Sequence, residues 1–365
     1  MIYIVLFKDN SCLAENNLPM MLLWLGELTM ASWVLSYGAE HLSKKYGGKF
    51  VGRTLLSIAT TLPEIAIVIY AAAGGSYGVA IGAGLGSNLL MMTLGLAIML
   101  LIATTRLSKA PLMGIDVSTF KLDKIFLIIT AIVSAVLFID GYNYIDGIIF
   151  AVMFVAYLAM ALFEMKAEKS KTKSTDFVHS SVDHEIVEVK EEHNPSNRFD
   201  KQMLKASLAF LAGTVGILVG AEPFIHSLVG FSTEIGISAI ILAIIISPIA
   251  GEMPEKISMM VLARKGATGS AIAVANVLGS KILNNTLLLA VAVFGAMYHG
   301  GFYTSISLNN LLAYQVVLVT VVTIIALIPM FKKEIGLKVG VMLAGMYIIS
   351  LFVQFLLPHE TNETH

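Results

Sequence analysis

Ten long apolar stretches constrain the fold of this chain more than any other feature of its sequence. A helix needs about 20 mostly apolar residues to cross the hydrocarbon core of a bilayer, and lipid offers no partners to backbone groups. The sequence therefore predicts an all-α polytopic membrane protein with ten transmembrane helices. The predicted spans are Pro19–Tyr37, Val51–Ala73, Tyr77–Ala103, Ile125–Ile139, Ile145–Phe163, Leu204–Val229, Ile237–Leu262, Ser270–Tyr298, Leu311–Met330 and Val339–Leu357.

One polar segment divides the chain into two apolar halves. Charged residues make up only 13% of the sequence, about half the share in soluble domains, which argues against a water-soluble globule. Many of these charges lie in residues 166–203. We therefore predict a first five-helix repeat in 1–165, a polar loop in 166–203 and a second repeat in 204–365. The net charge of −1 gives no electrostatic reason to expect nucleic acid binding.

The distribution of Lys and Arg predicts the orientation of the chain, because positive loops stay on the cytoplasmic side. Loops after the odd-numbered spans carry positive residues such as Lys44, Arg106 and Arg264, whereas the intervening loops carry acids such as Asp140 and Glu234. We expect a multi-pass protein of the plasma membrane with both termini outside and the 166–203 loop in the cytoplasm.

Three motifs recur in the same order in the two halves. Since each half holds an odd number of spans, a second copy must be inverted in the membrane, which is an architecture for alternating access around a site at the midplane. The motif pairs are Gly38-Ala39-Glu40 with Gly220-Ala221-Glu222, Thr60-Thr61-Leu62-Pro63-Glu64 with Gly251-Glu252-Met253-Pro254-Glu255, and the stretches 86–93 and 279–286, which begin Gly-Ser.

The Pro-Glu pairs predict a cation site. Proline within a helix lacks an N–H and pushes on the carbonyl four residues earlier, so each half should hold one freed carbonyl. The next residue is a carboxylate in an apolar span, where an ionised group is costly unless paired or solvated. Carboxylate, carbonyl, hydroxyl and amide oxygens together suit Ca²⁺ and also Na⁺. The freed carbonyls and the carboxylates are Ala59 with Glu64 and Ala250 with Glu255.

These motifs resemble the alpha repeats of the cation/calcium antiporter superfamily, which includes the sodium/calcium exchangers. The specific part of the resemblance covers roughly residues 38–93 and 220–286. It implies two inverted five-helix repeats that exchange Ca²⁺ for Na⁺ or H⁺ while the first and sixth helices slide. By motif position it implies Glu64 and Glu255 as the central Ca²⁺ ligands. The further ligands that it implies are Thr60, Thr61, Ser87, Ser280 and Asn284.

The second half departs from the family pattern at charged positions. The family usually has Thr-Ser before its second Pro-Glu and Gly-Ser-Asn afterwards, but this chain has Gly251-Glu252 and Lys281, and Met91 stands at the polar position four residues after Ser87. Glu252 either adds a carboxylate to the cation cavity or forms a buried ion pair with Lys281 that fixes geometry. A Lys281 ammonium that points into the cavity would substitute for a bound cation and change the stoichiometry.

We predict from these features a secondary antiporter that exchanges Ca²⁺ for Na⁺ without any cofactor. The alternative is exchange of Ca²⁺ or another divalent cation for H⁺, which the missing hydroxyls favour because protons also compete for carboxylates. A cation channel is the third possibility, and the inverted repeat argues against it. An enzyme is disfavoured because no nucleophile elbow, phosphate loop or His-rich metal motif accompanies the acids.

Overall fold

The computed structural model describes residues 17–45, 49–175, 198–307 and 309–356, and most of them are helical. The helices of the first half are α2 (Asn17–Lys45), α3 (Lys49–Ala73), α4 (Tyr77–Leu90), α5 (Leu96–Thr104), α6 (Lys121–Leu137) and α7 (Tyr144–Thr175). Those of the second half are α8 (Arg198–Ile235), α9 (Ala239–Ala263), α10 (Ala267–Leu283), α11 (Leu289–Gly300), α12 (Asn310–Leu327) and α13 (Leu337–Leu356).

Two pairs of these helices form single long rods. A π-helical turn, η1 (Met91–Gly95), joins α4 to α5, and a second one, η4 (Asn284–Leu288), joins α10 to α11. Short 3-10 turns, η2 (Ser118–Phe120), η3 (Phe138–Asp140) and η5 (Ile328–Phe331), extend α6 and α12. Both π turns begin within the Gly-Ser stretches 86–93 and 279–286, which the sequence pairs between the halves.

Eight of the ten predicted spans lie within one helix, within one of the two rods, or within α6 or α12 together with its 3-10 extension. The other two differ at one end, since α9 begins at Ala239, two residues after the predicted start at Ile237, and Leu357 lies outside the described residues. Eight helical segments in the described ranges are long and apolar enough to cross a membrane, and α3 and α9 contain the shorter apolar stretches Thr60–Ala73 and Ala239–Met253. The expectation of a polytopic, helical membrane protein is therefore confirmed. That α3 and α9 also cross the bilayer is part of the proposal below.

The polar segment is shorter than predicted at both ends. Helix α7 continues to Thr175 and α8 already begins at Arg198, so both flanks of the predicted 166–203 loop are helical. The run of Met, Lys, Ala and Glu that follows Phe163 consists mostly of strong helix formers, so the helix does not need an apolar surrounding to continue. Residues 176–197 lie outside the described part of the chain.

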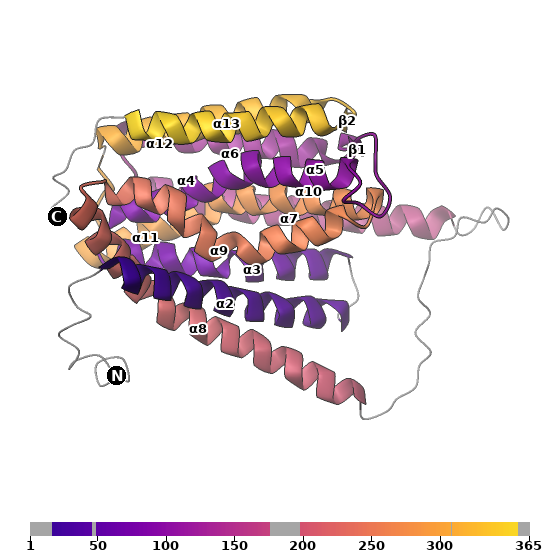
Figure 1. The fold of residues 1–365 in the computed structure, drawn as a ribbon, viewed down its shortest axis with the longest axis horizontal. Coiled ribbons are helices and arrows are strands. Elements are labelled where there is room, and N and C mark those ends of the chain that lie inside the picture. The colour runs from indigo at the N-terminus through magenta and orange to yellow at the C-terminus, as the bar shows by residue number, and fades with distance from the viewer. Residues whose placement is uncertain (1–16, 46–48, 176–197, 308, 357–365) are drawn as a thin grey trace.

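The two rods form the centre of the bundle. In the most apolar window of each rod 83% of the residues are buried, against 17% for α7 and 22% for α13. Helices α2 and α8 pack against each other along one side, and α12 and α13 lie on the opposite side (Figure 1). Helix α4 packs on α9 and α11 packs on α3, so each rod contacts the Pro-Glu helix of the other half.

A glycine sets the closest of these approaches. A Cβ atom on Gly86 in α4 would lie 2.1 Å from the backbone oxygen of Ile244 in α9. No other residue fits there without separating the two helices, which is how small residues act at membrane helix interfaces. The contact brings Ser87, the next residue, against the second half of the chain.

Loops from the two halves join at both ends of the bundle. Strand β1 (Ile115–Asp116) pairs antiparallel with β2 (Glu334–Ile335), with Ile115 opposite Ile335. Beyond the far end of α6, the backbones of Tyr142 and Ile306 form an isolated antiparallel bridge. Each connection links a loop beside α6 to a loop beside α12, and together they tie the halves to each other.

Candidate cation site

The two Pro-Glu carboxylates are buried, and each is held by a serine of the rod from its own half. Glu64 in α3 is 4% exposed and Glu255 in α9 is 2% exposed. Ser87 Oγ donates to Glu64 Oε1 and Ser280 Oγ donates to Glu255 Oε1, both at 2.8 Å. Asn276 Nδ2 adds a hydrogen bond of 3.2 Å to Glu255 Oε1. Asn276 was not among the predicted ligands; it lies one helical turn before Ser280.

Lys281 contacts Ser87, the serine that donates to Glu64. Its ammonium forms an ion pair with Glu252 Oε1, and both side chains are fully buried. The same ammonium donates to Ser87 Oγ at 2.6 Å, and Ser87 Oγ also lies in hydrogen-bond contact with Glu252 Oε1. The ion pair between Glu252 and Lys281, one of the two readings that the sequence left open, is therefore present.

The amide of Asn284 connects this ion pair to Glu64. In the orientation that satisfies both ends of the amide, Nδ2 donates to Glu64 Oε2 at 3.2 Å. Oδ1 then lies 2.5 Å from Ser87 Oγ and accepts from Lys281 Nζ at 3.3 Å. Five predicted or discussed residues thus form one hydrogen-bonded cluster: Glu64, Ser87, Glu252, Lys281 and Asn284.

A second ammonium, which the sequence analysis missed, lies on α9. Lys256 Nζ donates to the backbone oxygen of Pro248 at 2.9 Å and lies 3.8 Å from Glu252 Oε2. Glu252 Oε2 is buried and has no hydrogen-bond donor among the described residues. The i,i+4 spacing of Glu252 and Lys256 is the sequence signal that would have found this contact. The site thus brings together three carboxyl groups, those of Glu64, Glu252 and Glu255, and two amino groups, those of Lys256 and Lys281.

The remaining predicted ligands lie near the glutamates along their helices. Thr60 and Thr61 are buried in α3, one turn before Glu64, and Ala250 is fully buried in α9 before Glu255. Ala59 lies in α3, but its side chain is outside the described residues. Met91, which replaces a polar residue of the family pattern, is fully buried in the π turn. That the hydroxyls of Thr60 and Thr61 and the carbonyls of Ala59 and Ala250 act as cation ligands stays a prediction.

Gly251 explains one of the departures from the family pattern. A Cβ atom at this position would lie 2.8 Å from Glu64 Cγ. In this arrangement the side chain of Glu64 occupies the space that a threonine at position 251 would need. Position 251 therefore lacks the hydroxyl of the family pattern because Glu64 packs closely against α9 there.

A pair of asparagines joins the two rods beside the cluster. Asn88 Nδ2 donates to Asn285 Oδ1 at 2.5 Å, and Asn285 Nδ2 lies 3.4 Å from Thr130 Oγ1 in α6. Asn88 and Asn285 are both nearly fully buried. They stand within the repeated Gly-Ser motifs, but nothing in the sequence alone showed that they meet each other.

No group of three or more His, Cys, Asp or Glu side chains in the described ranges is placed so that it could hold a metal ion. Lys281, Ser87 and Asn284 lie between the carboxylates of Glu64 and Glu252. Any cation held by Glu64 and Glu255 must therefore take part of its coordination from hydroxyl, amide or carbonyl oxygens.

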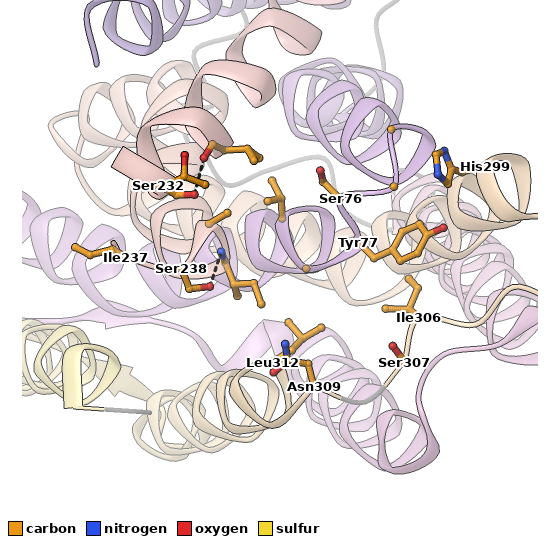
Figure 2. A pocket seen from close by; sticks show the side chains of 18 of the residues that line it. Ser76, Tyr77, Ser232, Ile237, Ser238, His299, Ile306, Ser307, Asn309 and Leu312 are labelled. Atoms are coloured by element: carbon orange, nitrogen blue, oxygen red, sulfur yellow. Dashed lines mark hydrogen bonds between the residues drawn. The ribbon is translucent and has the colours of Figure 1, made fainter. Parts of the chain in front are cut away.

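A pocket of about 730 Å³ lies among interhelical turns at one end of the bundle, and Figure 2 shows the side chains that line it. Its lining comes from the turns after α3 and α8, from the adjoining ends of α4, α8, α9 and α11, and from the residues around the start of α12, and it includes Ser76, Tyr77, Ser232, Ser238 and His299. His299 Nδ1 lies 2.9 Å from the backbone oxygen of Ala73. The turn after α3 begins ten residues beyond Glu64, or about 15 Å along the helix, so the pocket is separate from the cluster.

Comparison with known proteins identifies the family. A family model described as sodium/calcium exchanger protein matches residues 18–163 and 205–356. The chain belongs to this family. The resemblance seen in the repeated motifs is thereby confirmed, and the family name describes exchangers, that is, membrane transporters.

Several relatives of this exchanger-family chain cover most of its length. The uncharacterized membrane protein MJ0091 of Methanocaldococcus jannaschii is 25% identical over 91% of this chain and 98% of its own. The inner membrane protein YrbG of Escherichia coli is 23% identical over 87% of this chain and 90% of its own. The putative antiporter CaxA of Alkalimonas amylolytica is 23% identical over 70% of this chain and 73% of its own.

Solved structures of exchangers share the fold of this family member. The H⁺/Ca²⁺ exchanger CAX superposes with a TM-score of 0.73 at 20% identity, covering 98% of this chain and 86% of that one. The sodium-calcium exchanger NCX_Mj superposes with a TM-score of 0.58 at 21% identity, covering 92% and 97%. Since one neighbour exchanges Ca²⁺ for H⁺ and the other is a sodium-calcium exchanger, the shared fold leaves both coupling ions open for this chain.

Proposed function

We propose that this exchanger-family protein is a secondary antiporter that exchanges Ca²⁺ for Na⁺ by alternating access, with Glu64 and Glu255 as the central ligands. The observation that carries the proposal is the pair of buried carboxylates on α3 and α9, each hydrogen-bonded to a serine of a central rod. Buried acids within membrane helices are expensive, so two of them at matching motif positions indicate a cation pathway.

The donor set around these carboxylates suits Ca²⁺. This ion takes six to eight oxygen ligands in a flexible geometry. Glu64 and Glu255 supply carboxylate oxygens, and Ser87, Ser280 and Asn284 lie in direct contact with them. We assign further oxygens to the hydroxyls of Thr60 and Thr61, the carbonyls of Ala59 and Ala250, and Glu252 Oε2.

Exchange follows if the two kinds of ion compete for the same carboxylates. Ca²⁺ neutralises both central glutamates at once, whereas their mutual repulsion disfavours a state with neither cation nor proton bound. The charges of Glu252, Glu255 and Lys281 all act on Glu64, so occupancy at one carboxylate changes the energy at the others. Such coupling favours obligatory exchange over a continuous leak.

We propose that the chain crosses the plasma membrane ten times as two inverted repeats, 1–165 and 204–365, with the polar segment 166–203 in the cytoplasm and both termini outside. Three features support the arrangement. They are the matching π turns, the two loop connections beside α6 and α12, and the alternation of Lys-rich and Lys-free loops. On this orientation the pocket beside Ser76 and His299 faces outside, where it would form a vestibule.

Protons are the second candidate for the coupling ion. Gly251 and Met91 place no hydroxyl or amide oxygen at two positions that are polar in the family pattern, which lowers the number of ligands for Na⁺. A carboxylate that lacks a metal ion can take up a proton instead. The experiment therefore has to compare both gradients.

The test is ⁴⁵Ca²⁺ uptake into proteoliposomes loaded with Na⁺, against K⁺-loaded vesicles and vesicles with a pH gradient. We expect uptake that depends on internal Na⁺ and disappears in Glu255→Gln. Glu334→Gln, which changes an exposed carboxylate in β2, is the matched control and should transport like the wild type. Uptake driven only by the pH gradient would move the coupling to protons, and Ca²⁺ flux without any counter-ion would overturn exchange in favour of a channel.

A further inference from the structure

We propose that the Lys281 ammonium is a built-in monovalent cation, which permanently fills one cation subsite of the central cluster and lowers by one the number of mobile coupling cations carried per Ca²⁺. The inference rests on the proposed exchange function and adds to it a stoichiometric role for one side chain.

The first argument is the set of atoms around the ammonium. Lys281 Nζ contacts Glu252 Oε1 and Ser87 Oγ, and Asn284 Oδ1 accepts from it at 3.3 Å. An ammonium has three N–H donors and no acceptor, so these three oxygens match its capacity. One carboxylate, one hydroxyl and one amide oxygen also form a donor set suited to a hard monovalent cation.

The second argument is burial. Lys281 and Glu252 are both fully buried, so water does not solvate the ammonium. Its charge is held by the protein in the same way as the charge of a bound ion. The three oxygens come from α9, α4 and η4, which makes the subsite part of the contact between the two rods and the second Pro-Glu helix.

The third argument is the comparison of the two halves. Glu252 and Lys281 correspond by motif position to Thr61 and Asn88, which are neutral. The second half therefore carries a carboxylate and an ammonium where the first half carries neither, and the net charge of the cluster stays the same. The second half has thus gained a carboxylate that can bind a cation, Glu252, together with a covalently attached cation, Lys281, that pairs with it.

The fourth argument separates this role from that of a structural ion pair. Lys281 also donates to Ser87, and Ser87 and Asn284 both hydrogen-bond to Glu64. Two unit charges 4 Å apart repel by about 4 kcal/mol at an effective dielectric constant of 20. A Na⁺ ion therefore does not share these oxygens with the ammonium, and the subsite is closed to mobile cations.

The experiment measures whether a cation refills the subsite when the ammonium is removed. Purified Lys281→Met protein is melted in Ca²⁺-free detergent solution at pH 9, over a series of NaCl concentrations, with N-methyl-D-glucamine chloride holding the ionic strength constant. Glu252 Oε1 then lacks its ammonium partner, so Na⁺ binding at this oxygen stabilises the folded state in proportion to ln(1 + [Na⁺]/Kd). We expect the melting temperature of this variant to rise with Na⁺ more steeply than that of the wild type.

Two matched variants isolate the charge. Lys281→Arg keeps a cation, and Glu252→Gln/Lys281→Met removes both charges, so neither should gain Na⁺ dependence. Lys281→Asn, which copies the residue at the matching position Asn88, repeats the test if the methionine variant does not fold. Equal Na⁺ dependence in Lys281→Asn or Lys281→Met and in the double variant would overturn the proposal.

Transport gives the second readout. In proteoliposomes, the reversal potential of Lys281→Asn should correspond to one more monovalent cation per Ca²⁺ than that of the wild type, and an unchanged value would count against a tethered cation. The melting experiment needs no transport, so its outcome stands even if the wild type shows no Ca²⁺ exchange, a result that would refute the proposed function alone.

Discussion

Replacement of Gly251 by alanine tests the geometry of the cation cluster through a single methyl group. The new Cβ would lie 2.8 Å from Glu64 Cγ, whereas ordinary van der Waals contact begins at 3.4 Å, so the Glu64 side chain has to move by about 0.6 Å. If the carboxylate moves equally, its hydrogen bond with Ser87 lengthens from 2.8 Å to about 3.4 Å, where little of the bond remains.

The size of the effect follows from the lost hydrogen bond. A hydrogen bond to a charged group contributes about 1.5–3 kcal/mol, and 1.4 kcal/mol is a factor of about ten in an equilibrium constant. We therefore expect Gly251→Ala to weaken Ca²⁺ binding roughly 10- to 100-fold, measured by titration calorimetry of the purified protein.

The control is Gly84→Ala in α4, where a new Cβ would meet Leu288 Cδ2 at an ordinary 3.6 Å. Both variants gain helix propensity of about 1 kcal/mol from the same chemical change, so a difference between them reports the contact with Glu64. Equal Ca²⁺ affinities in the two variants would refute the reasoning.

Two further predictions concern the loops that join the halves. Lys124 is 2% exposed and donates to the backbone oxygens of Val117 at 2.8 Å and Met330 at 2.6 Å, so Lys124→Met should remove one hydrogen bond from each carbonyl and cost about 1–3 kcal/mol. Faster amide exchange in β1 and β2 would show this loss, with the exposed Lys121→Met as a control that should leave exchange unchanged. Hydrogen bonds from the side chain and the backbone of Ser118 hold the pKa of Asp116 below its ordinary value of 3.8, so its stabilising effect is present above that pH and is lost as the pH falls through the lower folded value. Protection of the Ser118 amide, corrected for intrinsic exchange, should fall below about pH 4 in the wild type and not in Asp116→Asn, and a parallel fall in both would contradict the assignment.

The helices were predictable because the bilayer imposes a simple requirement on sequence. Apolar length and loop charge indicated every helix of the bundle, including α6, whose predicted apolar stretch was short. The joints within the rods were not predicted, because the predicted spans run through the π turns at Met91 and Asn284 without a break. The ends of α7 and α8 were also misplaced, because helix formers continue a helix after the apolar stretch has ended.

The candidate site was predictable as far as the repeated motifs reach. The Pro-Glu and Gly-Ser motifs indicated Glu64, Ser87, Glu255 and Ser280, and the structure pairs them within each half. The contacts of Lys281 with Glu252 and Ser87 join residues that lie far apart in the sequence, so only the fold could decide between an ion pair and a separate carboxylate. Lys256 was missed because a span predicted from its apolar length draws no attention to a single charged residue within it, here in Ile237–Leu262.

On the proposed arrangement of ten spans, the charges on α9 also bear on how the chain enters the membrane during synthesis. Glu252, Glu255 and Lys256 lie within five consecutive residues, and a charged residue at the centre of an inserting helix costs about 2.5–3.5 kcal/mol. The hydrophobicity of α9 has to offset this cost before any partner has emerged. Lys281, the partner of Glu252, follows on α10, the next helix to be made. On the proposed arrangement, stable insertion of α9 therefore depends on α10, which is synthesised after it, and we expect the two helices to insert together.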